Sequence, residues 1–271
     1  MSRMELGIIG AGNMAEAIAR GLLRSALFAA DQIIVSDVTS ARRELFQSQL
    51  HVRVTQDNGE VVRDCRRLLL SVKPQMMAKV LEGLGSAMRP DTLIISIAAG
   101  ISTSFIAGAL GGGHRWRVVR AMPNTPMLVG AGISAICPGS NATTEDLADV
   151  RKMFQSAGAV IETTEDKMDA VTAVSGSGPA YFFYLTEQLI AAAVELGIPP
   201  IEARELAART ALGAAKMLIE DPATPAELRR KVTSPGGTTE AAITHLDKCG
   251  WAAAMIDAVK AAAARSKELS R

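Results

Sequence analysis

Short apolar runs rich in Ile and Val alternate with segments of helical periodicity through the N-terminal part of this 271-residue chain. Such alternation is typical of β-α-β units around a parallel sheet, so the expected fold class is an α/β, Rossmann-type doubly wound sheet. We expect strands at residues 4–9, 33–36, 68–72, 93–97 and 117–121. Residues 128–136 and 159–162 are candidates to extend the sheet.

The pattern changes after residue 163, where strand-like runs stop and long helical segments begin. The sequence therefore predicts a dinucleotide-binding domain at 1–163 and an all-helical dimerisation and substrate-binding domain at 164–271. Apolar residues recur on one face of each of three helical segments: Phe182, Leu185, Leu189, Ala193 and Leu196; Leu206, Thr210, Gly213, Ala214, Met217 and Leu218; Ala252, Met255, Ile256, Val259, Ala262 and Ala263. Core packing within one subunit accounts for many of these apolar positions. For so small a domain, faces this extensive also favour burial in a homodimer or a higher assembly of dimers.

Charge and composition exclude several other classes of protein. Lys and Arg number 29 against 28 Asp and Glu, which offers no electrostatic argument for binding nucleic acid or an anionic membrane. No apolar run reaches the roughly 18 residues of a membrane span, and we expect a cytoplasmic protein. Cys65, Cys137 and Cys249 show no metal-ligand or disulfide spacing, so we expect small buried side chains and no metal.

The first expected strand runs directly into Gly10-Ala11-Gly12-Asn13-Met14-Ala15, which fits the pattern G-x-G-x-x-A. The first glycine of this pattern makes a tight turn, and the second lets the backbone approach a pyrophosphate. The small last residue lets the following helix pack closely on the strand, and N–H groups at the helix start then face the phosphates. The pattern predicts that the chain binds a dinucleotide.

Asp37 ends the second expected strand, in the place of the acid that binds a ribose 2′-hydroxyl in NAD-binding folds. The same turn also carries hydroxyls and arginines, which suit the 2′-phosphate of NADPH. Arg42 and Arg43 equally fit an ordinary solvated helix face. The residues by themselves leave NADH and NADPH both open. The hydroxyls and arginines are Ser36, Thr39, Ser40, Arg42 and Arg43.

Three further loops follow strand ends, at residues 71–75, 97–100 and 121–126, where open α/β sheets place ligands. They carry small residues and prolines, with Lys73 as the one cation, placed either to meet a phosphate or to lie along the surface. His51, His114 and His245 form no pattern with a nucleophile or a metal ligand. Hydride transfer suits such a sparse site, because the cofactor supplies the reactive atom.

The segment SPGGTTEA, residues 234–241, places one proline and two glycines before a helix expected to begin near Glu240. We expect Thr238 or Thr239 to cap this helix, with neighbouring backbone N–H groups pointing outward. N–H groups at a helix start attract carboxylates and phosphates. A well-capped helix without a ligand is the plain alternative.

Six segments together, in this order and spacing, resemble pyrroline-5-carboxylate reductase: GIIGAGNMAEAI, SVKPQ, SIAAGI, RAMPNTP, SGSGPAYFF and SPGGTTEA. The resemblance covers nearly the whole chain. It implies reduction of L-1-pyrroline-5-carboxylate to L-proline with NADPH or NADH, the last step of proline biosynthesis. It also implies a homodimer whose active site lies between the cofactor domain of one subunit and the helical domain of its partner.

The resemblance further implies roles for individual positions. Cofactor contacts fall on Ile9, Gly10, Ala11, Gly12, Asn13, Met14, Asp37, Asn58, Ser71, Val72, Lys73, Pro74, Ile97, Ala98 and Ala99. Substrate contacts fall on Glu165, Thr172, Val232, Gly237, Thr238 and Thr239. Backbone N–H groups of residues 237–239 are expected to hold the substrate carboxylate, and the Thr239 hydroxyl to meet the ring nitrogen as the catalytic group. Lys231 stands where the family can carry a polar amide, and Asp37 where some members carry a hydroxyl.

Two other functions remain as alternatives. A β-hydroxyacid-type dehydrogenase shares the layout, but it uses a lysine on the first long helix of the second domain, and here none occurs after Pro179 before Lys216. A non-catalytic nicotinamide-nucleotide sensor keeps the fold without turnover.

Overall fold

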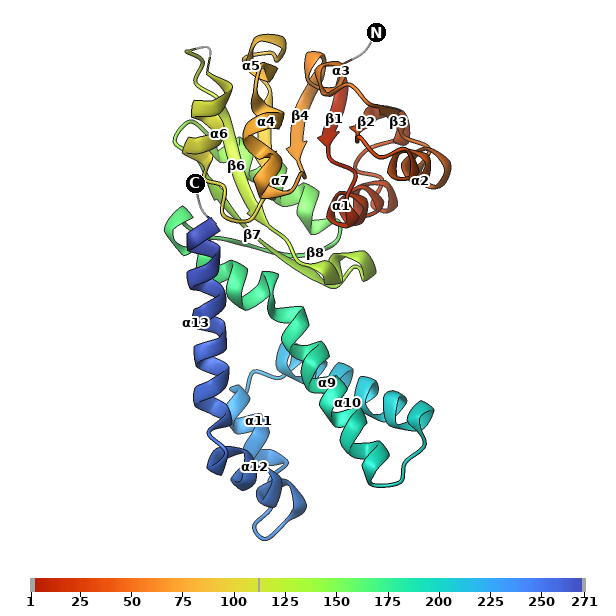
Figure 1. Ribbon diagram of the computed structural model, residues 1–271, viewed down its shortest axis with the longest axis vertical. Helices are drawn as coiled ribbons and strands as arrows, with labels where there is room; N and C mark the ends of the chain where they lie inside the picture. Colours follow the sequence, from red (N-terminus) through yellow and green to blue (C-terminus); the bar gives the residue numbers. More distant parts are fainter. Residues whose placement is uncertain (1–2, 112, 270–271) are drawn as a thin grey trace. The chain divides into compact units, whose positions relative to one another are not determined.

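The protein divides into two compact units (Figure 1). The computed structural model describes residues 3–111 and 113–269. One unit, here called the sheet unit, runs through Ser177 and takes in the chain again from Ala262. The other, the helical unit, is Gly178–Ala261. Residues 164–177 and the end of the last helix, which the sequence groups with the helical domain, thus lie in the sheet unit.

The sheet unit contains eight strands in the order β3-β2-β1-β4-β5-β6-β7-β8. Neighbouring strands are parallel except for β6 and β7, which pair antiparallel. The chain crosses from β3 to β4 over the β1–β2 pair, so β1 lies at the centre of a doubly wound sheet, as the sequence predicts. The strands are β1 Met4–Ile9, β2 Ile33–Ser36, β3 Arg53–Thr55, β4 Cys65–Leu70, β5 Leu93–Ser96, β6 Arg117–Met122, β7 Gly132–Pro138 and β8 Gly158–Glu162.

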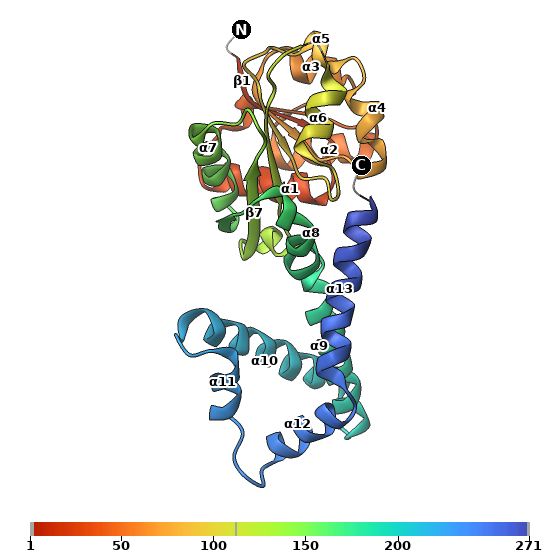
Figure 2. The same cartoon turned by 90° about the vertical axis from the view of Figure 1, so that its left-hand side faces the viewer.

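Helices cover both faces of this sheet because its strands are apolar on both sides. Leu6 and Ile8 of β1 belong to one buried cluster, with side chains of α1, α2 and α7, whereas Ile9 belongs to a second cluster with α3, α4, α5 and α6. Figure 2 shows α7 on one side of the sheet and α4 and α6 on the other. The helices are α1 Asn13–Arg24, α2 Ser40–Leu50, α3 Asn58–Arg63, α4 Met77–Leu81, α5 Leu84–Ala87, α6 Thr103–Leu110, α7 Thr144–Gln155 and α8 Met168–Val171. The sheet unit also contains short helical segments of other types. These are the 3₁₀ helices η1 Ala30–Gln32, η2 Pro74–Met76, η3 Thr125–Val129 and η4 Glu165–Lys167, and the π-helix η5 Thr172–Gly176.

Four strand expectations need correction. β5 ends at Ser96, so residue 97 belongs to the following loop. Residues 128–131 are not strand: η3 occupies Thr125–Val129, and Gly130 ends it in a left-handed conformation with φ of 75°. β4 begins at Cys65 and ends at Leu70, so Ser71 and Val72 form a loop. β3 was not predicted because its three residues, Arg53–Thr55, carry no apolar run.

The helical unit has almost no buried core of its own. Within Gly178–Ala261, all of which the structure describes, the buried hydrophobic side chains are Ala203, Ala207 and Leu228. Large apolar side chains stay exposed, including Phe182, Phe183, Leu185, Leu189, Leu206, Leu212, Met217, Leu218 and Ile256. Its helices are α9 Gly178–Glu195, α10 Pro200–Glu220, α11 Pro225–Lys231, α12 Thr238–Lys248 and α13 Trp251–Leu269, whose end belongs to the sheet unit. α9 and α10 pack against each other.

Two of the three cysteines are buried, as expected, but Cys249 at the end of α12 is exposed, which corrects the prediction for that residue. Burial raises the pKa of Cys65 to about 12 and that of Cys137 to about 11. Both thiols therefore stay protonated at neutral pH and pack as apolar groups. Among the described residues, no helix is long and apolar enough to cross a membrane.

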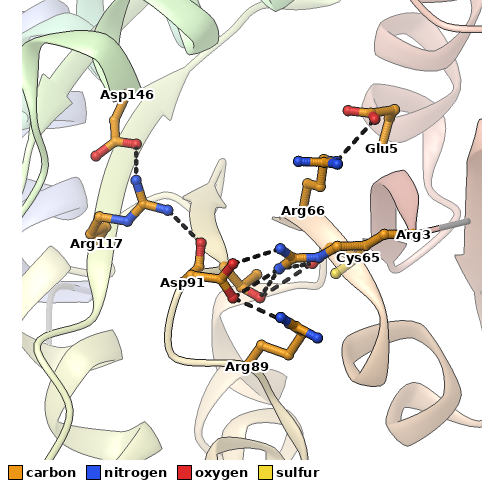
Figure 3. Close-up of polar contacts among 9 residues, drawn as sticks. Arg3, Glu5, Cys65, Arg66, Arg89, Asp91, Arg117 and Asp146 are labelled. Atoms are coloured by element: carbon orange, nitrogen blue, oxygen red, sulfur yellow. Dashed lines mark hydrogen bonds and ion pairs between the residues drawn. The ribbon is translucent and has the colours of Figure 1, made fainter.

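Charged side chains form a network at the edge of the sheet where β1, β4, β5 and β6 begin (Figure 3). Arg3 donates to both carboxylate oxygens of Asp91, at 2.7 and 3.2 Å, and to the backbone oxygen of Cys65 at 2.9 Å. Arg89 also pairs with this carboxylate: its Nε lies 3.3 Å from Asp91 Oδ1. Arg117 donates to the backbone oxygen of Asp91 and joins the network to α7 through Asp146. Hydrogen bonds from Arg3 hold the pKa of Asp91 down to about 2.

We expect Asp91→Asn to lower the free energy of unfolding at neutral pH by less than about 1 kcal/mol, because this carboxylate is more than half exposed. The folded-state pKa is depressed, so the stabilisation is present above the unfolded value near pH 4 and disappears as pH falls toward 2. Urea unfolding at several pH values measures the difference. Asp31→Asn, at an exposed carboxylate without an ion-pair partner in the described chain, is the control. A difference independent of pH contradicts the assignment.

Candidate functional site

The expected cofactor residues come together at the carboxyl edge of the sheet. Backbone hydrogen bonds join each loop to the neighbouring strand: Gly10 N–H donates to Ser36 O at 2.8 Å, and Ser71 N–H to Ile9 O at 2.9 Å. Ile97 N–H donates to Leu70 O at 3.1 Å. Because parallel strands end at one edge, the turns after β1, β2, β4 and β5 are neighbours in space.

The two glycines of the first turn have different physical requirements. Gly10 has φ of +96°, and a Cβ there would lie 2.6 Å from the backbone oxygen of Ser71. Only glycine fits both restrictions. Gly12 is the N-cap of α1, and a Cβ there would meet no atom within 4 Å. Packing therefore does not require Gly12; open space in front of a helix start fits a pyrophosphate that approaches the backbone.

α1 presents its first turn without a side-chain cap. Gly12 and Asn13 are exposed, whereas Ala11 and Ala15 are buried. The helix thus leaves backbone N–H groups free at its exposed end, while its other face packs on the sheet. These residues have the geometry to hold the phosphates of a dinucleotide.

The other expected cofactor residues surround this turn. Asp37 follows β2 and accepts a hydrogen bond from Ala11 N–H at 2.7 Å. Asn58 begins α3 and accepts one from the Ser36 hydroxyl at 2.7 Å. Lys73 is exposed in the turn before η2, and Ala98 is buried with its N–H 3.3 Å from Ser96 Oγ.

Two of the expected substrate residues lie in the sheet unit. Glu165 begins η4 and binds Thr103 twice, accepting from its N–H and from its hydroxyl, each at 2.7 Å. Thr172 begins the π-helix η5, an element often associated with functional sites, and its hydroxyl donates to Met168 O at 2.8 Å.

Arg120 is a buried cation behind Glu165 that the sequence analysis did not identify. It is only 4% exposed, and its Nη1 lies 3.6 Å from Glu165 Oε1. Its Nε and Nη2 have no hydrogen-bond partner among the described residues. It stands opposite Cys137 in the antiparallel β6–β7 pair. A buried guanidinium needs a nearby negative charge, so Glu165 has an electrostatic role whatever else it binds.

The remaining expected substrate residues, Val232 and Gly237–Thr239, lie in the helical unit. α12 begins at Thr238, and its N-cap is Gly237, which supplies no side-chain cap. The expectation that a threonine caps this helix is therefore wrong. Gly237 N–H donates to Ser234 O at 3.0 Å and Gly236 N–H to Glu240 at 2.7 Å, so both N–H groups serve the loop itself. This leaves Thr238 and Thr239 to present the first-turn N–H groups of α12.

Lys231, whose role the sequence left open, pairs with Asp221 at 3.1 Å. This contact joins the two ends of the segment around α11. Because both side chains are accessible, the pair contributes little to stability, and it gives Lys231 a local structural role.

Known proteins match this sequence along almost its entire length. The pyrroline-5-carboxylate reductase of Synechocystis sp. is 45% identical over 269 residues, which is 99% of both chains. The Escherichia coli enzyme of the same name is 38% identical and covers 98% of both chains. The chain belongs to the pyrroline-5-carboxylate reductase family.

The family models and solved structures agree with this assignment. A model described as pyrroline-5-carboxylate reductase dimerisation matches residues 165–269, and one described as NADP oxidoreductase coenzyme F420-dependent matches residues 5–100. The reductase structure from Coxiella burnetii is 36% identical with a TM-score of 0.89 over all of both chains. The Plasmodium falciparum pyrroline carboxylate reductase, solved with NADP bound, is 28% identical with a TM-score of 0.89 over the same coverage.

The sequence analysis did not identify three residues that contact the proposed site residues or the elements around them: Asn124, Thr103 and Arg120. Asn124 is buried, donates to Ser175 O at 3.1 Å and accepts from Ile133 N–H at 2.9 Å, which ties the end of β6 to η5 and β7. Thr103 and Arg120 likewise act through Glu165. Asn124 and Arg120 both fall in the motif RAMPNTP, which was the available signal, but only their burial reveals what they contact.

Replacing each glycine of the first turn by alanine separates folding from binding. Gly10→Ala is expected to lower the free energy of unfolding by about 1 to 2 kcal/mol or more, because of its positive φ and the contact with Ser71 O. Gly12→Ala is expected to unfold like the wild type but to bind a nicotinamide dinucleotide more weakly. Urea unfolding and calorimetric titration measure the two effects. Wild-type dinucleotide affinity in Gly12→Ala contradicts the assignment of the turn.

Glu165→Gln keeps the shape of the side chain and one accepting oxygen, replaces the other oxygen with an NH₂ donor, and removes the charge that faces Arg120. We expect the free energy of unfolding to fall by about 1 to 3 kcal/mol, less than for a fully buried pair because Glu165 is partly exposed. Denaturant unfolding at fixed protein concentration measures it. Asp166→Asn, at the exposed neighbouring acid, is the matched control. Equal stability of both variants would show that Arg120 does not depend on Glu165.

Proposed function

We propose that this chain reduces L-1-pyrroline-5-carboxylate to L-proline with NAD(P)H, the last step of proline biosynthesis. The observation that carries the proposal is the match to named reductases over the full chain, at 38% to 45% identity. The glycine turn at the carboxyl edge of the sheet supports it, because such a turn suits a dinucleotide. The absence of acid–base clusters in the motifs also suits hydride transfer to an imine that is already electrophilic.

The residues around the first turn hold the cofactor in this proposal. Bound NAD(P)H supplies the hydride. Gly12 and Asn13 offer first-turn N–H groups to its pyrophosphate, and Asp37 lies beside its adenosine ribose. The full proposed set is Ile9, Gly10, Ala11, Gly12, Asn13, Met14, Asp37, Asn58, Ser71, Val72, Lys73, Pro74, Ile97, Ala98 and Ala99.

The start of α12 binds the substrate in this proposal. N–H groups of Thr238 and Thr239 hold the carboxylate, Gly237 shapes the turn, and the Thr239 hydroxyl hydrogen-bonds the ring nitrogen. Glu165, Thr172 and Val232 complete the substrate contacts. With a proton on the ring nitrogen, hydride addition to the C=N carbon yields the secondary amine of proline, so the protein needs to orient the ring and not to supply a strong acid.

The helical domain also forms a homodimer in this proposal, with residues 164–271 as the dimerisation and substrate-binding part. The scarcity of buried apolar side chains between Gly178 and Ala261 supports it. A segment with so many exposed Leu, Ile and Phe side chains gains stability only when another surface covers them. We also propose a cytoplasmic location, because all three cysteines are free, as in a reducing compartment.

NAD(P)H absorbance with L-1-pyrroline-5-carboxylate tests the function. We expect oxidation of the cofactor and formation of proline by the wild-type chain. Binding of the dinucleotide without turnover indicates a sensor instead, and turnover only with a β-hydroxyacid indicates a dehydrogenase of that type.

Thr239→Val tests the catalytic assignment within that assay. The loss of one positioned hydroxyl is expected to lower kcat/KM by the equivalent of about 1 to 3 kcal/mol while the fold stays intact. Thr244→Val, at an exposed threonine on the same helix, is the control and is expected to keep wild-type kinetics. Unchanged kinetics of Thr239→Val contradicts the role of its hydroxyl.

A further inference from the structure

The carboxylate of Asp37 is held in one orientation on the glycine turn. Its Oδ2 accepts from Ala11 N–H at 2.7 Å, and its Oδ1 accepts from Thr39 N–H at 2.8 Å. The strand that precedes it is tied to the same turn, since Gly10 N–H donates to Ser36 O. Each carboxylate oxygen keeps further capacity to accept a hydrogen bond. Asp37 is therefore a fixed negative group at the end of β2.

The position of the Asp37 carboxylate determines which part of a bound dinucleotide it would contact. The open space at Gly12 and the uncapped start of α1 fit the pyrophosphate of a dinucleotide. With the pyrophosphate there, the end of the second strand lies beside the ribose of the adenosine half. A carboxylate accepts hydrogen bonds from a free 2′-hydroxyl, whereas it repels a 2′-phosphate, which carries nearly two negative charges at neutral pH.

Arg42 does not offset this repulsion, because its guanidinium already serves the protein. It donates to Ala11 O and to Glu16 at 2.8 Å, and it lies 5.7 Å from the centre of the Phe46 ring. Although partial burial opposes the charged form, hydrogen bonds from Arg42 and Arg20 hold the pKa of Glu16 below its usual value. Arg42 thus clamps α2 to α1 and to the glycine turn.

Arg43 also makes a hydrogen bond within the protein. Its Nη1 donates to the backbone oxygen of Asp37 at 2.6 Å. This contact directs one guanidinium N–H to the backbone of the turn and away from a ligand. Any attraction of Arg43 for a 2′-phosphate is opposed by the Asp37 carboxylate on the same turn, which also accepts a hydrogen bond from a 2′-hydroxyl.

We infer that Asp37 makes this chain favour NADH over NADPH, with Arg42 as a clamp of the glycine turn and not a phosphate ligand. The inference rests on the proposed function for the identity of the cofactor.

Calorimetric titration of the full-length protein with NAD⁺ and NADP⁺ tests selectivity without turnover. The wild type is expected to bind NAD⁺ at least about tenfold more tightly, which corresponds to one charge-assisted hydrogen bond gained or one repulsion avoided. Adenosine 5′-monophosphate and adenosine 2′,5′-bisphosphate are expected to show the same order. Equal or tighter binding of the 2′-phosphorylated ligands overturns the inference.

Two substitutions of the acid show whether it is responsible. Asp37→Ser is expected to reduce the NAD⁺ preference by about tenfold or more, because the hydroxyl keeps a polar group and removes the charge. Asp37→Asn, which keeps the shape, decides the question if thermal unfolding shows that the serine variant is unstable. Unchanged selectivity in a folded variant overturns the inference.

Arg42→Met separates a clamp from a phosphate ligand. If Arg42 is a clamp, the substitution is expected to weaken the binding of NAD⁺ and of NADP⁺ by the same factor. A loss of affinity for NADP⁺ alone overturns the assignment of Arg42. Turnover with pyrroline-5-carboxylate is measured separately. A protein that selects NAD⁺ but does not turn over contradicts only the proposed function, and one that turns over but prefers NADP⁺ contradicts only the inference.

Discussion

The parallel pairing of β1 with both β2 and β4 is the constraint on which the cofactor side of this protein depends. Ile9 stands opposite Ser36 on one side and Leu70 on the other, so all three strands end at the same level. Gly10, Asp37 and Ser71 follow these ends and become neighbours although they are far apart in sequence. The close approach of Gly10 to Ser71 O shows how tightly the turns pack. A shift of one residue in the β1–β2 pairing would move the carboxylate of Asp37 away from Ala11 N–H.

The two edges of the sheet satisfy their polar groups in opposite ways. At the amino edge, arginines bind backbone oxygens and carboxylates in a closed network that includes Arg3, Asp91 and Arg117. At the carboxyl edge, the start of α1 keeps N–H groups without a side-chain cap. The protein's own groups therefore fill most of the first edge, where Arg3 Nε alone of the guanidinium nitrogens of Arg3 lacks a hydrogen-bond partner among the described residues. The second edge keeps hydrogen-bonding capacity for a ligand.

The helical unit poses a different physical problem, because its sequence is apolar but its side chains are largely uncovered. Burial of Ala203, Ala207 and Leu228 removes little apolar area from water compared with the conformational entropy of ordering five helices. Folding and association of such a unit are best treated as one equilibrium, in which protein concentration affects stability. The proposed substrate residues at the start of α12 belong to this unit, so we expect their rigidity to depend on the same association.

Local pattern determined much of this protein in advance. Alternating apolar periods predicted the main strands, with β1 and β2 at their observed bounds, and the ordered motifs predicted the family and its reaction. The positive φ of Gly10 is a local requirement, so the sequence pattern could indicate it, whereas its close contact with Ser71 O could not be predicted. Local pattern failed for β3, which has no apolar run, and for residues 128–131, where Gly130 ends a 3₁₀ helix. Only the tertiary structure decided that Arg42 binds Ala11 and Glu16, that Arg120 is buried opposite Glu165, and that β7 runs antiparallel to β6. These features depend on groups brought together from distant parts of the chain, and periodicity and composition do not specify which distant groups meet.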